Sequence, residues 1–291
     1  MLMMKTVIKL LRIKQWTKNL FLFPALFFSH RLYDMSACIT VTVAALAFCF
    51  TSSAIYIFND WCDIEADRSH IKKKYRPLAS GQISIPVALT IMSACALVSI
   101  LITSIFNLPL GFILILLVYL IINICYSLGC KHIPLIEMLM VSSGFVLRLI
   151  AGGVVINAHL TNWIIYCTWL LSLMLVVGKR RSDISQVNDI QNKRRSLAYY
   201  NVYFLDLMLT MLVGATLICY IMFCVSNYAG KQFGDYLYLT VPFVLIGILR
   251  FMQIIIMDKG GDDPTNVIIE DKTIIYSIIL WLTTFFIIIY I

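Results

Sequence analysis

Four oxygen-bearing side chains with a regular spacing follow a long apolar segment: Asn59, Asp60, Asp63 and Asp67. If that segment continues as a helix, the spacing of three and four residues places all four near one helical face. Carboxylates this close repel one another, so a cation must compensate them. Hard oxygen ligands with an amide among them suit Mg2+, which shares its coordination shell with substrate phosphates. We therefore predict that these four residues bind Mg2+ on a diphosphate, and that the three aspartates are catalytic.

A solvated helix end is the competing explanation for the acidic residues. In that case Arg68 and Lys72 would form ion pairs with them, and no ligand would be involved. This explanation suffices for one or two acids. It accounts less well for an asparagine and three aspartates on one face at a membrane boundary, so the metal–diphosphate hypothesis is preferred.

Basic residues follow in the same loop, ending in an Arg-Pro turn. Lys72, Lys73, Lys74 and Arg76 precede Pro77, which restricts Arg76 to an extended conformation. Cations here can neutralise the phosphate oxygens that the metal does not reach. A topology signal explains two of the four cations but not their arrangement. Lys73 and Arg76 are therefore predicted to bind substrate.

The elements that position these residues are membrane-spanning helices. The chain has 291 residues, of which 61% are hydrophobic and 13% are charged, too few charges to cover a soluble domain. A spanning helix needs about 20 largely apolar residues. The sequence predicts an all-α polytopic membrane bundle of about nine such helices, forming one integral membrane transferase domain over 1–291. The expected spans are 17–34, 37–58, 84–106, 109–128, 134–156, 162–178, 203–226, 236–257 and 273–291.

The distribution of basic residues predicts the orientation. With the N-terminus inside, 19 of the 23 lysines and arginines lie in inner segments and only Arg31 and Lys231 lie outside. We expect the N-terminus and the active site on the cytoplasmic face of a bacterial inner membrane, and the C-terminus outside. The long inner loops 59–83 and 179–202 are expected to form the active-site cap.

Several other classes of site are excluded. The basic residues lie in short loops between apolar segments, which argues against nucleic-acid binding despite the net charge of +8. The nine cysteines form no CxxC pair, and the four histidines have no ligand spacing, so neither a disulfide framework nor a zinc site is expected.

The motif Asn59-Asp60-x-x-Asp63-x-x-x-Asp67, followed by a basic Arg-Pro turn, resembles the first motif of the UbiA superfamily of intramembrane transferases. The resemblance extends over essentially the whole chain. It is greatest to the branch of decaprenyl-phosphate phosphoribosyltransferases, on three further segments. These are 15–19 (QWTKN), 144–148 (GFVLR) and 178–181 (GKRR).

One departure from the superfamily pattern favours that branch. Prenyltransferases of the superfamily have a second aspartate-rich motif after the sixth span, but here Asp183 and Asp189 are six residues apart and lie on different helical faces. The same region is basic, with Lys179, Arg180 and Arg181. One acidic cluster and many cations suit a donor with a diphosphate and a sugar phosphate, and a lipid phosphate acceptor.

The resemblance and the basic residues suggest further substrate-binding residues. Lys18 and Tyr56 are expected to bind the donor. Lys131, which follows Tyr126 at the end of the fourth span, is expected to bind the phosphate of donor or acceptor, although a topology role is equally compatible with its spacing. Arg148 lies within a span, where phosphate binding and a buried structural role are equally balanced. The full set of expected substrate-binding residues is Lys18, Tyr56, Lys73, Arg76, Tyr126, Lys131, Arg148, Lys179, Arg180 and Arg181.

The resulting hypothesis is magnesium-dependent transfer of a 5-phosphoribosyl group from phosphoribosyl diphosphate to a polyprenyl phosphate lipid. The alternative is transfer of a polyprenyl chain from its diphosphate to an aromatic acceptor. A transporter is disfavoured because the charges lie at one face and not at mid-membrane. A non-catalytic membrane scaffold would bind no diphosphate with magnesium.

Overall fold

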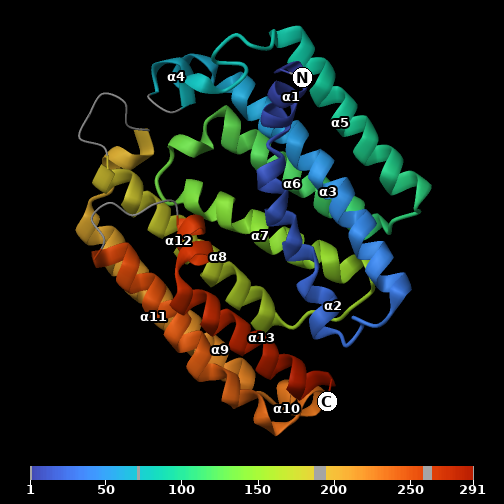
Figure 1. The fold of residues 1–291 in the computed structure, drawn as a ribbon, viewed down its shortest axis with the longest axis vertical. Helices are drawn as coiled ribbons and strands as arrows, with labels where there is room; N and C mark the ends of the chain where they lie inside the picture. The colour runs from blue at the N-terminus through green and yellow to red at the C-terminus, as the bar shows by residue number, and fades with distance from the viewer. Residues whose placement is uncertain (1, 71–72, 187–194, 258–263, 291) are drawn as a thin grey trace. The chain divides into compact units, whose positions relative to one another are not determined.

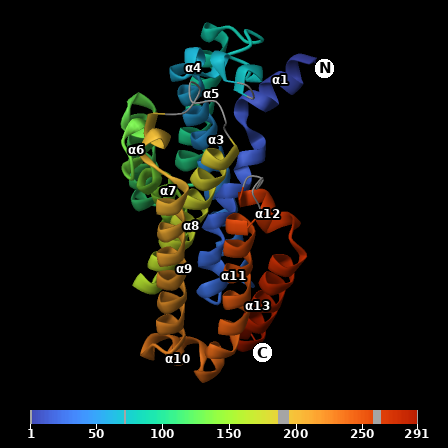
Figure 2. The same ribbon diagram turned by 90° about the vertical axis from the view of Figure 1, so that its left-hand side faces the viewer.

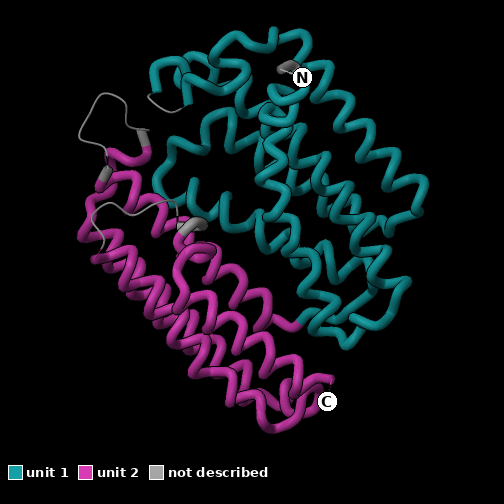
Figure 3. The backbone as a smooth tube through the Cα atoms, in the orientation of Figure 1, with its two compact units in different colours: residues 1–160 teal, residues 161–291 magenta. Residues whose placement is uncertain are grey.

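The computed structural model describes residues 2–70, 73–186, 195–257 and 264–290. These residues form helices and the turns between them, with no strand among them. The chain divides into two compact units, residues 1–160 and 161–291 (Figure 3). Each unit is described by itself.

Unit 1 is built around one long helix, α3. This helix lies alongside α5, α6, α7 and the 3-10 helix η1 (Figure 1). Its core contains large apolar side chains such as Leu22, Phe48 and Phe112, all fully buried. The elements of unit 1 are α1 (Leu2–Leu11), η1 (Ile13–Leu22), α2 (Pro24–Phe28), α3 (Met35–Cys62), α4 (Ile64–Ser69), η2 (Lys73–Tyr75), α5 (Ile85–Ile105), α6 (Leu110–Leu128), η3 (Cys130–His132) and α7 (Ile136–Val155).

Unit 2 is a second group of long helices. In it α8 packs on α9, and α11 packs on both α9 and α13 (Figure 2). The elements of unit 2 are α8 (Asn162–Gln186), η5 (Arg195–Tyr199), α9 (Val202–Cys224), α10 (Asn227–Phe233), η6 (Asp235–Thr240), α11 (Val241–Met257), α12 (Pro264–Glu270) and α13 (Lys272–Tyr290).

The described residues contain eight helices that are long and apolar enough to cross a membrane. They correspond to eight of the nine expected spans, and the all-helical membrane fold is confirmed. The chain is an integral membrane protein. The eight candidate spans are Met35–Cys62, Ile85–Ile105, Leu110–Leu128, Ile136–Val155, Asn162–Ser185, Val202–Cys224, Asp235–Met257 and Lys272–Tyr290.

The first expected span, 17–34, differs from the others because it is not one continuous α-helix. The chain forms η1, then restarts as the five-residue α2 with Pro24 at its first position. Proline has no backbone N–H and cannot continue the hydrogen bonding of a preceding helix. The segment also runs very close to α7: a Cβ built on Gly152 would stand 2.0 Å from the carbonyl oxygen of Leu22. Glycine at 152 therefore lets the broken segment pack directly against the α7 backbone.

Candidate active site

The four expected metal ligands lie where α3 ends and α4 begins. Asn59 and Asp60 are in the last turn of α3, Asp63 is the junction residue, and Asp67 is on α4. The expected single helix is thus interrupted after Cys62. The hydrogen bonds from the Asp63 N–H to the Asn59 carbonyl (3.0 Å) and from the Asp67 N–H to the Asp63 carbonyl (2.8 Å) keep helical spacing across the junction. Asp60 and Asp67 are only 2% and 3% exposed.

Two arginines compensate the buried carboxylates. Nη1 of Arg76 donates to Oδ1 of Asp60 at 3.0 Å and to Oδ2 of Asp67 at 2.6 Å, so one guanidinium bridges both acids. Asp60 also forms an ion pair with Arg12, whose guanidinium lies over the ring of Tyr56, 5.2 Å from its centroid. A buried carboxylate without a partner would be strongly destabilising. The arginines therefore allow the two buried carboxylates, Asp60 and Asp67, to lie close together at one helix end.

A lysine from the next helical hairpin completes the cluster. Lys131, on η3 directly after α6, is 6% exposed and forms an ion pair with Asp63. The amide of Asn59 joins the two helices: Nδ2 donates to Asp63 Oδ2 at 3.3 Å, and Oδ1 accepts a hydrogen bond from Ser127 Oγ at 3.1 Å. We call these residues the acidic cluster and its cations: Asn59, Asp60, Asp63 and Asp67 with Arg12, Arg76 and Lys131.

The turn that follows Arg76 is fixed by the packing of its apolar residues. Pro77, Leu78 and Ala79 are buried, and Leu78 packs in a small apolar core with Leu10 of α1 and Ile57 of α3. The N–H of Ile83 donates to the Pro77 carbonyl at 3.2 Å, which closes the turn. The turn that follows Arg76 therefore holds its guanidinium against the carboxylates.

The remaining expected substrate ligands of unit 1 lie on neighbouring elements. Lys18 is half-buried on η1, Tyr126 is half-buried in the last turn of α6, and Lys73 is exposed on η2. Tyr56 is half-buried one turn before Asp60. The roles of these residues stay predictions.

Arg148 lies deeper in unit 1 and is 3% exposed. Its Nε donates to Asn19 Oδ1 at 2.7 Å, Nη1 to the Gly144 carbonyl at 2.7 Å, and Nη2 to Ser52 Oγ and Tyr119 Oη at 3.4 and 3.2 Å. Within the described residues these hydrogen-bond partners are all uncharged. Ser52 precedes Asp60 by eight residues, about 12 Å along α3. This geometry favours the structural role for Arg148, and phosphate binding by it stays a prediction.

The expected cations of the second inner loop belong to unit 2. Lys179 is exposed on α8, whereas Arg180 and Arg181 are each 7% exposed. Arg180 pairs with Asp183 at 3.0 Å. Arg181 pairs with Asp206 at 2.6 Å and donates to the carbonyls of Ile255 and Ile256 at the end of α11, at 2.5 and 2.9 Å. Arg181 thus joins three helices of unit 2.

Asp189, Lys193 and Arg194 lie outside the described residues. The substrate-binding roles of Lys179, Arg180 and Arg181 stay predictions.

Sequence reasoning missed two members of the site, Arg12 and Ser127. Arg12 belongs to a basic N-terminal segment that also matches a topology signal, and nothing in its local spacing distinguishes it from its basic neighbours. The sequence signal that could have indicated a role for Arg12 was its position, three residues before the segment 15–19 that carries part of the family resemblance. Ser127 lies in an apolar helix, where a serine more often bonds to its own backbone; it does so here too, at 2.9 Å to the Asn123 carbonyl.

The side chains of the acidic cluster suit a magnesium ion. Three carboxylates and one amide are hard oxygen ligands of the kind that Mg2+ prefers. Oxygens of Asp60 and Asp67 already converge on a single cationic nitrogen of Arg76. In the part of the chain that the structure describes, no three His, Cys, Asp or Glu side chains gather in a ready-made metal cage. The chemistry of the donors fits the ion, while in this structure arginine and lysine neutralise the carboxylates.

Comparisons with known proteins agree with the family resemblance of the sequence motifs. The model of the UbiA prenyltransferase family matches residues 20–269. A decaprenyl-phosphate phosphoribosyltransferase of Corynebacterium glutamicum is 34% identical, over 94% of this chain and 84% of the relative. The enzyme of that name from Mycolicibacterium smegmatis is 29% identical, over 96% and 90%. The structure of a UbiA homolog from Archaeoglobus fulgidus bound to GPP and Mg2+ has the same fold, with a TM-score of 0.72, 20% identity and coverage of 98% of this chain and 100% of the other.

Proposed function

Because the chain belongs to the UbiA prenyltransferase family and is a membrane-embedded transferase, we propose that it transfers a 5-phosphoribosyl group to a polyprenyl phosphate. The donor is phosphoribosyl diphosphate, and the reaction depends on magnesium. The observation that carries this proposal is the acidic cluster with its three cations at the end of α3. The two relatives named decaprenyl-phosphate phosphoribosyltransferase support the choice of donor and acceptor.

The balance of charge favours this donor over a prenyl diphosphate. In unit 1 each carboxylate of the cluster already has a cationic partner. In unit 2, Asp183 pairs with Arg180. The described part of the inner loop 179–202 therefore adds no carboxylate that lacks a basic partner. A prenyl diphosphate with an uncharged acceptor brings one anionic group. A phosphoribosyl diphosphate and a polyprenyl phosphate bring three, which many basic side chains suit.

Asn59, Asp60, Asp63 and Asp67 would hold the magnesium ion. When bound, the ion supplies positive charge that stabilises the diphosphate as it departs. Arg12, Arg76 and Lys131, which pair with carboxylates of the acidic cluster, can exchange that partner for a phosphate oxygen. Each is a charge-assisted donor that is already oriented by a hydrogen bond to a carboxylate of the cluster.

The bond changes follow from the two substrates. A phosphate oxygen of the acceptor forms a bond to C1 of the ribose, and the bond from C1 to the diphosphate oxygen breaks. The acceptor oxygen is already anionic, so no strong general base is needed. Lys131 would orient the acceptor phosphate, and Lys18, Tyr56, Lys73 and Arg76 the donor. Lys179, Arg180 and Arg181 of unit 2 stay proposed substrate-binding residues. Exclusion of water protects the donor from hydrolysis.

The placement in the cell is part of the proposal. We place the N-terminus and the acidic cluster on the cytoplasmic face of a bacterial inner membrane, since the basic residues concentrate in the inner segments. Residues 1–291 then act as one transferase domain, with the loops 59–83 and 179–202 as its cap.

Two radiolabelled donors test the proposal. Purified protein in vesicles is given magnesium and a polyprenyl phosphate together with phosphoribosyl diphosphate labelled in the ribose. The expected result is label in the lipid fraction. In a parallel reaction, a labelled prenyl diphosphate is offered with an aromatic acceptor. Label on the aromatic product and none on the lipid phosphate would replace the proposal by prenyl transfer, and label in neither fraction would reject both.

A further inference from the structure

Arg12, which forms an ion pair with Asp60, has a backbone conformation that residues other than glycine rarely adopt. Its φ is 51° and its ψ is 46°, in the left-handed region. It is the residue between the end of α1 at Leu11 and the start of η1 at Ile13. A side chain of this kind is disfavoured in that conformation, which persists only where the surrounding structure enforces it. The contacts on either side of Arg12 must therefore hold it.

A buried serine of α3 contacts the chain on both sides of Arg12. Ser53 is 0% exposed, and its Oγ donates to the Leu11 carbonyl at 2.9 Å. The same Oγ accepts a hydrogen bond from Nε1 of Trp16 at 3.0 Å. The carbonyls in the last turn of a helix have no partner within that helix, so the Leu11 carbonyl needs such a donor. One hydroxyl group thus fixes the residue before Arg12 and a residue four positions after it.

The hydroxyl of Ser53 is used differently from that of its neighbour Ser52. Ser52 donates to the carbonyl of Phe48, four residues earlier, at 2.7 Å, which is the usual bond of a serine inside a helix. Ser53 donates instead to a residue 42 positions away in the sequence. The ring of Trp16 also packs edge-on against Phe50 of α3, with centroids 5.7 Å apart. These contacts attach the N-terminal segment to α3.

The same face of α3 carries the groups that receive the Arg12 side chain. Ser53, Tyr56 and Asp60 are separated by three and four residues, so they lie within two turns on one face. The Arg12 guanidinium lies over the ring of Tyr56 and pairs with Asp60. Ser53 therefore holds the backbone beside Arg12 at one end of this face, and Asp60 holds the guanidinium at the other.

We propose that Ser53 is a positioning residue for the diphosphate site. By fixing Leu11 and Trp16, it keeps Arg12 in the left-handed conformation from which the guanidinium reaches the acidic cluster. Ser53 acts through Arg12 and not by contact with the substrate. The inference rests on the proposed function only in that a diphosphate binds at the acidic cluster, and it applies to a phosphoribosyl donor and to a prenyl donor alike.

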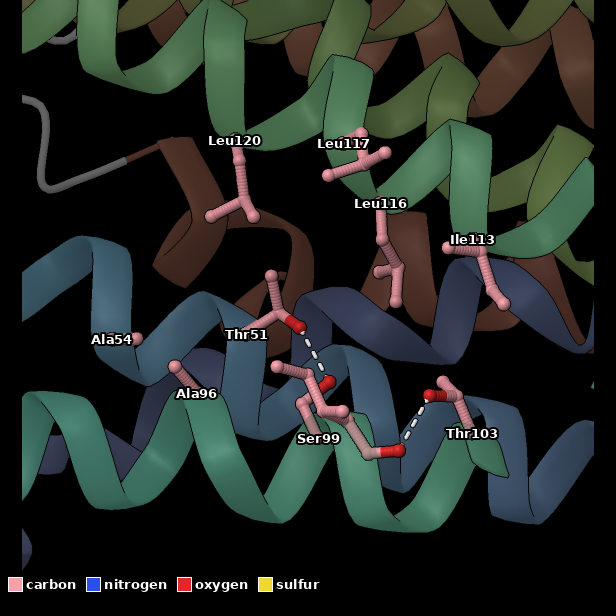
Figure 4. A pocket seen from close by; sticks show the side chains of 10 residues that line it. Thr51, Ala54, Ala96, Ser99, Thr103, Ile113, Leu116, Leu117 and Leu120 are labelled. Atoms are coloured by element: carbon pink, nitrogen blue, oxygen red, sulfur yellow. Dashed lines mark hydrogen bonds between the residues drawn. The ribbon is translucent and has the colours of Figure 1, made fainter. Parts of the chain in front are cut away.

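Ser53→Ala removes the hydroxyl with little change in volume, and Ser99→Ala is its matched control. Ser99 is 4% exposed on α5. Its hydroxyl is also shared between a backbone carbonyl, that of Ala47 at 3.0 Å, and a second side chain, Thr51 at 2.8 Å (Figure 4). The two variants lose equivalent hydrogen bonds within unit 1, but of the two only Ser53→Ala loses a bond to the segment that carries Arg12.

Binding of inorganic diphosphate with magnesium, measured by titration calorimetry on the purified protein, tests the inference. We expect Kd to rise about tenfold in Ser53→Ala and to stay unchanged in Ser99→Ala, because Arg12 is no longer preorganised. Arg12→Gln should raise Kd at least as much, and adding Ser53→Ala to it should have no further effect. An unchanged Kd in Ser53→Ala would overturn the inference. So would effects that multiply in the double variant, since Ser53 would then act independently of Arg12.

Limited proteolysis measures the position of Arg12 without any ligand. Trypsin cleaves after arginine, and the bond between Arg12 and Ile13 is protected as long as the segment stays folded. Initial cleavage at this bond, identified by mass spectrometry, should be about tenfold faster in Ser53→Ala than in wild type or Ser99→Ala. Equal rates in Ser53→Ala and wild type would refute the inference alone. A wild type that binds no diphosphate with magnesium would refute the proposed function, and proteolysis would still decide whether Ser53 holds Arg12 at the acidic cluster.

Discussion

Arg12 and Asp60 are 48 residues apart in the sequence and form an ion pair at the end of α3. The pair connects the start of the broken N-terminal segment to the most buried carboxylate of the acidic cluster. Arg76 contacts the same oxygen of Asp60 from the other direction along the chain. The N-terminal segment is therefore part of the candidate active site.

Replacing Arg12 by glutamine should lower kcat/KM for the diphosphate donor by at least about tenfold, since one charge-assisted donor to the diphosphate is lost. The loss of stability should be smaller than the loss of activity, because Arg76 still compensates the charge of Asp60. Turnover and the unfolding temperature of purified protein measure the two effects. Arg12→Lys should recover part of the activity. Lys14→Gln, an exposed change on η1, is the control, and equal activity of the two glutamine variants would contradict the role of Arg12.

Asp67→Ala or Asp63→Ala should lower turnover by about a hundredfold or more, without preventing membrane insertion. The reason is that each substitution removes an expected metal ligand; Asp67→Ala also removes one of the two carboxylates that pair with Arg76, and Asp63→Ala removes the carboxylate that pairs with Lys131. Glu65→Ala is the matched control, because Glu65 is exposed on the same short helix. Wild-type turnover in either aspartate variant would show that the cluster is not the catalytic site.

Removal of divalent cations by a chelator should stop turnover, and Mg2+ should restore it. An independent readout is the unfolding temperature, which ligands of the folded state raise by mass action. Magnesium together with phosphoribosyl diphosphate should raise it in wild type and not in Asp67→Ala. A donor-induced rise that is unaffected by chelation would mean that the basic residues bind the donor without the metal.

Arg148→Met should mainly destabilise unit 1. The substitution leaves buried acceptors on Asn19 and Ser52 without this donor, at a cost of about 1–3 kcal/mol for each unsatisfied group. It also removes the cation between the rings of Phe48 and Tyr119, each 4.9 Å from the guanidinium carbon. A lower unfolding temperature with unchanged KM for both substrates is expected. A raised KM for either substrate at unchanged stability would instead support phosphate binding by Arg148.

The ion pair of Asp271 with Arg250 in unit 2 predicts a pH dependence. Hydrogen bonds from Arg250, at 3.2 and 2.9 Å, and from the Ile274 N–H lower the pKa of Asp271 below its ordinary value of 3.8. A depressed folded-state pKa adds stability above the unfolded value, and this is lost as the pH falls through the folded value. Asp271→Asn should lower the unfolding temperature at pH 7 by at most about 2–4 °C, because the pair is partly exposed. The difference should shrink below pH 3.8; a constant difference at all pH values would contradict the linkage.

The membrane helices and the acidic motif could be derived from the sequence because both are local properties. Twenty apolar residues in a row specify a spanning helix through their own backbone hydrogen bonds and their transfer into lipid. Asn59, Asp60, Asp63 and Asp67 lie close together because they share a few helical turns. The break in the first segment had a local signal too, at Pro24, but the close approach of Leu22 to Gly152 depends on packing.

Which cation meets which carboxylate was decided by the tertiary structure. Lys131 and Asp63 are 68 residues apart, and Arg12 and Asp60 are 48 apart. Many lysines and arginines lie within reach of the same face, and their spacing along the chain does not distinguish a topology signal from a ligand. The packing of η1, α6 and the Arg-Pro turn against α3 selects Arg12, Lys131 and Arg76, because a buried charge is stable only where a rigid neighbour brings its opposite within hydrogen-bonding distance.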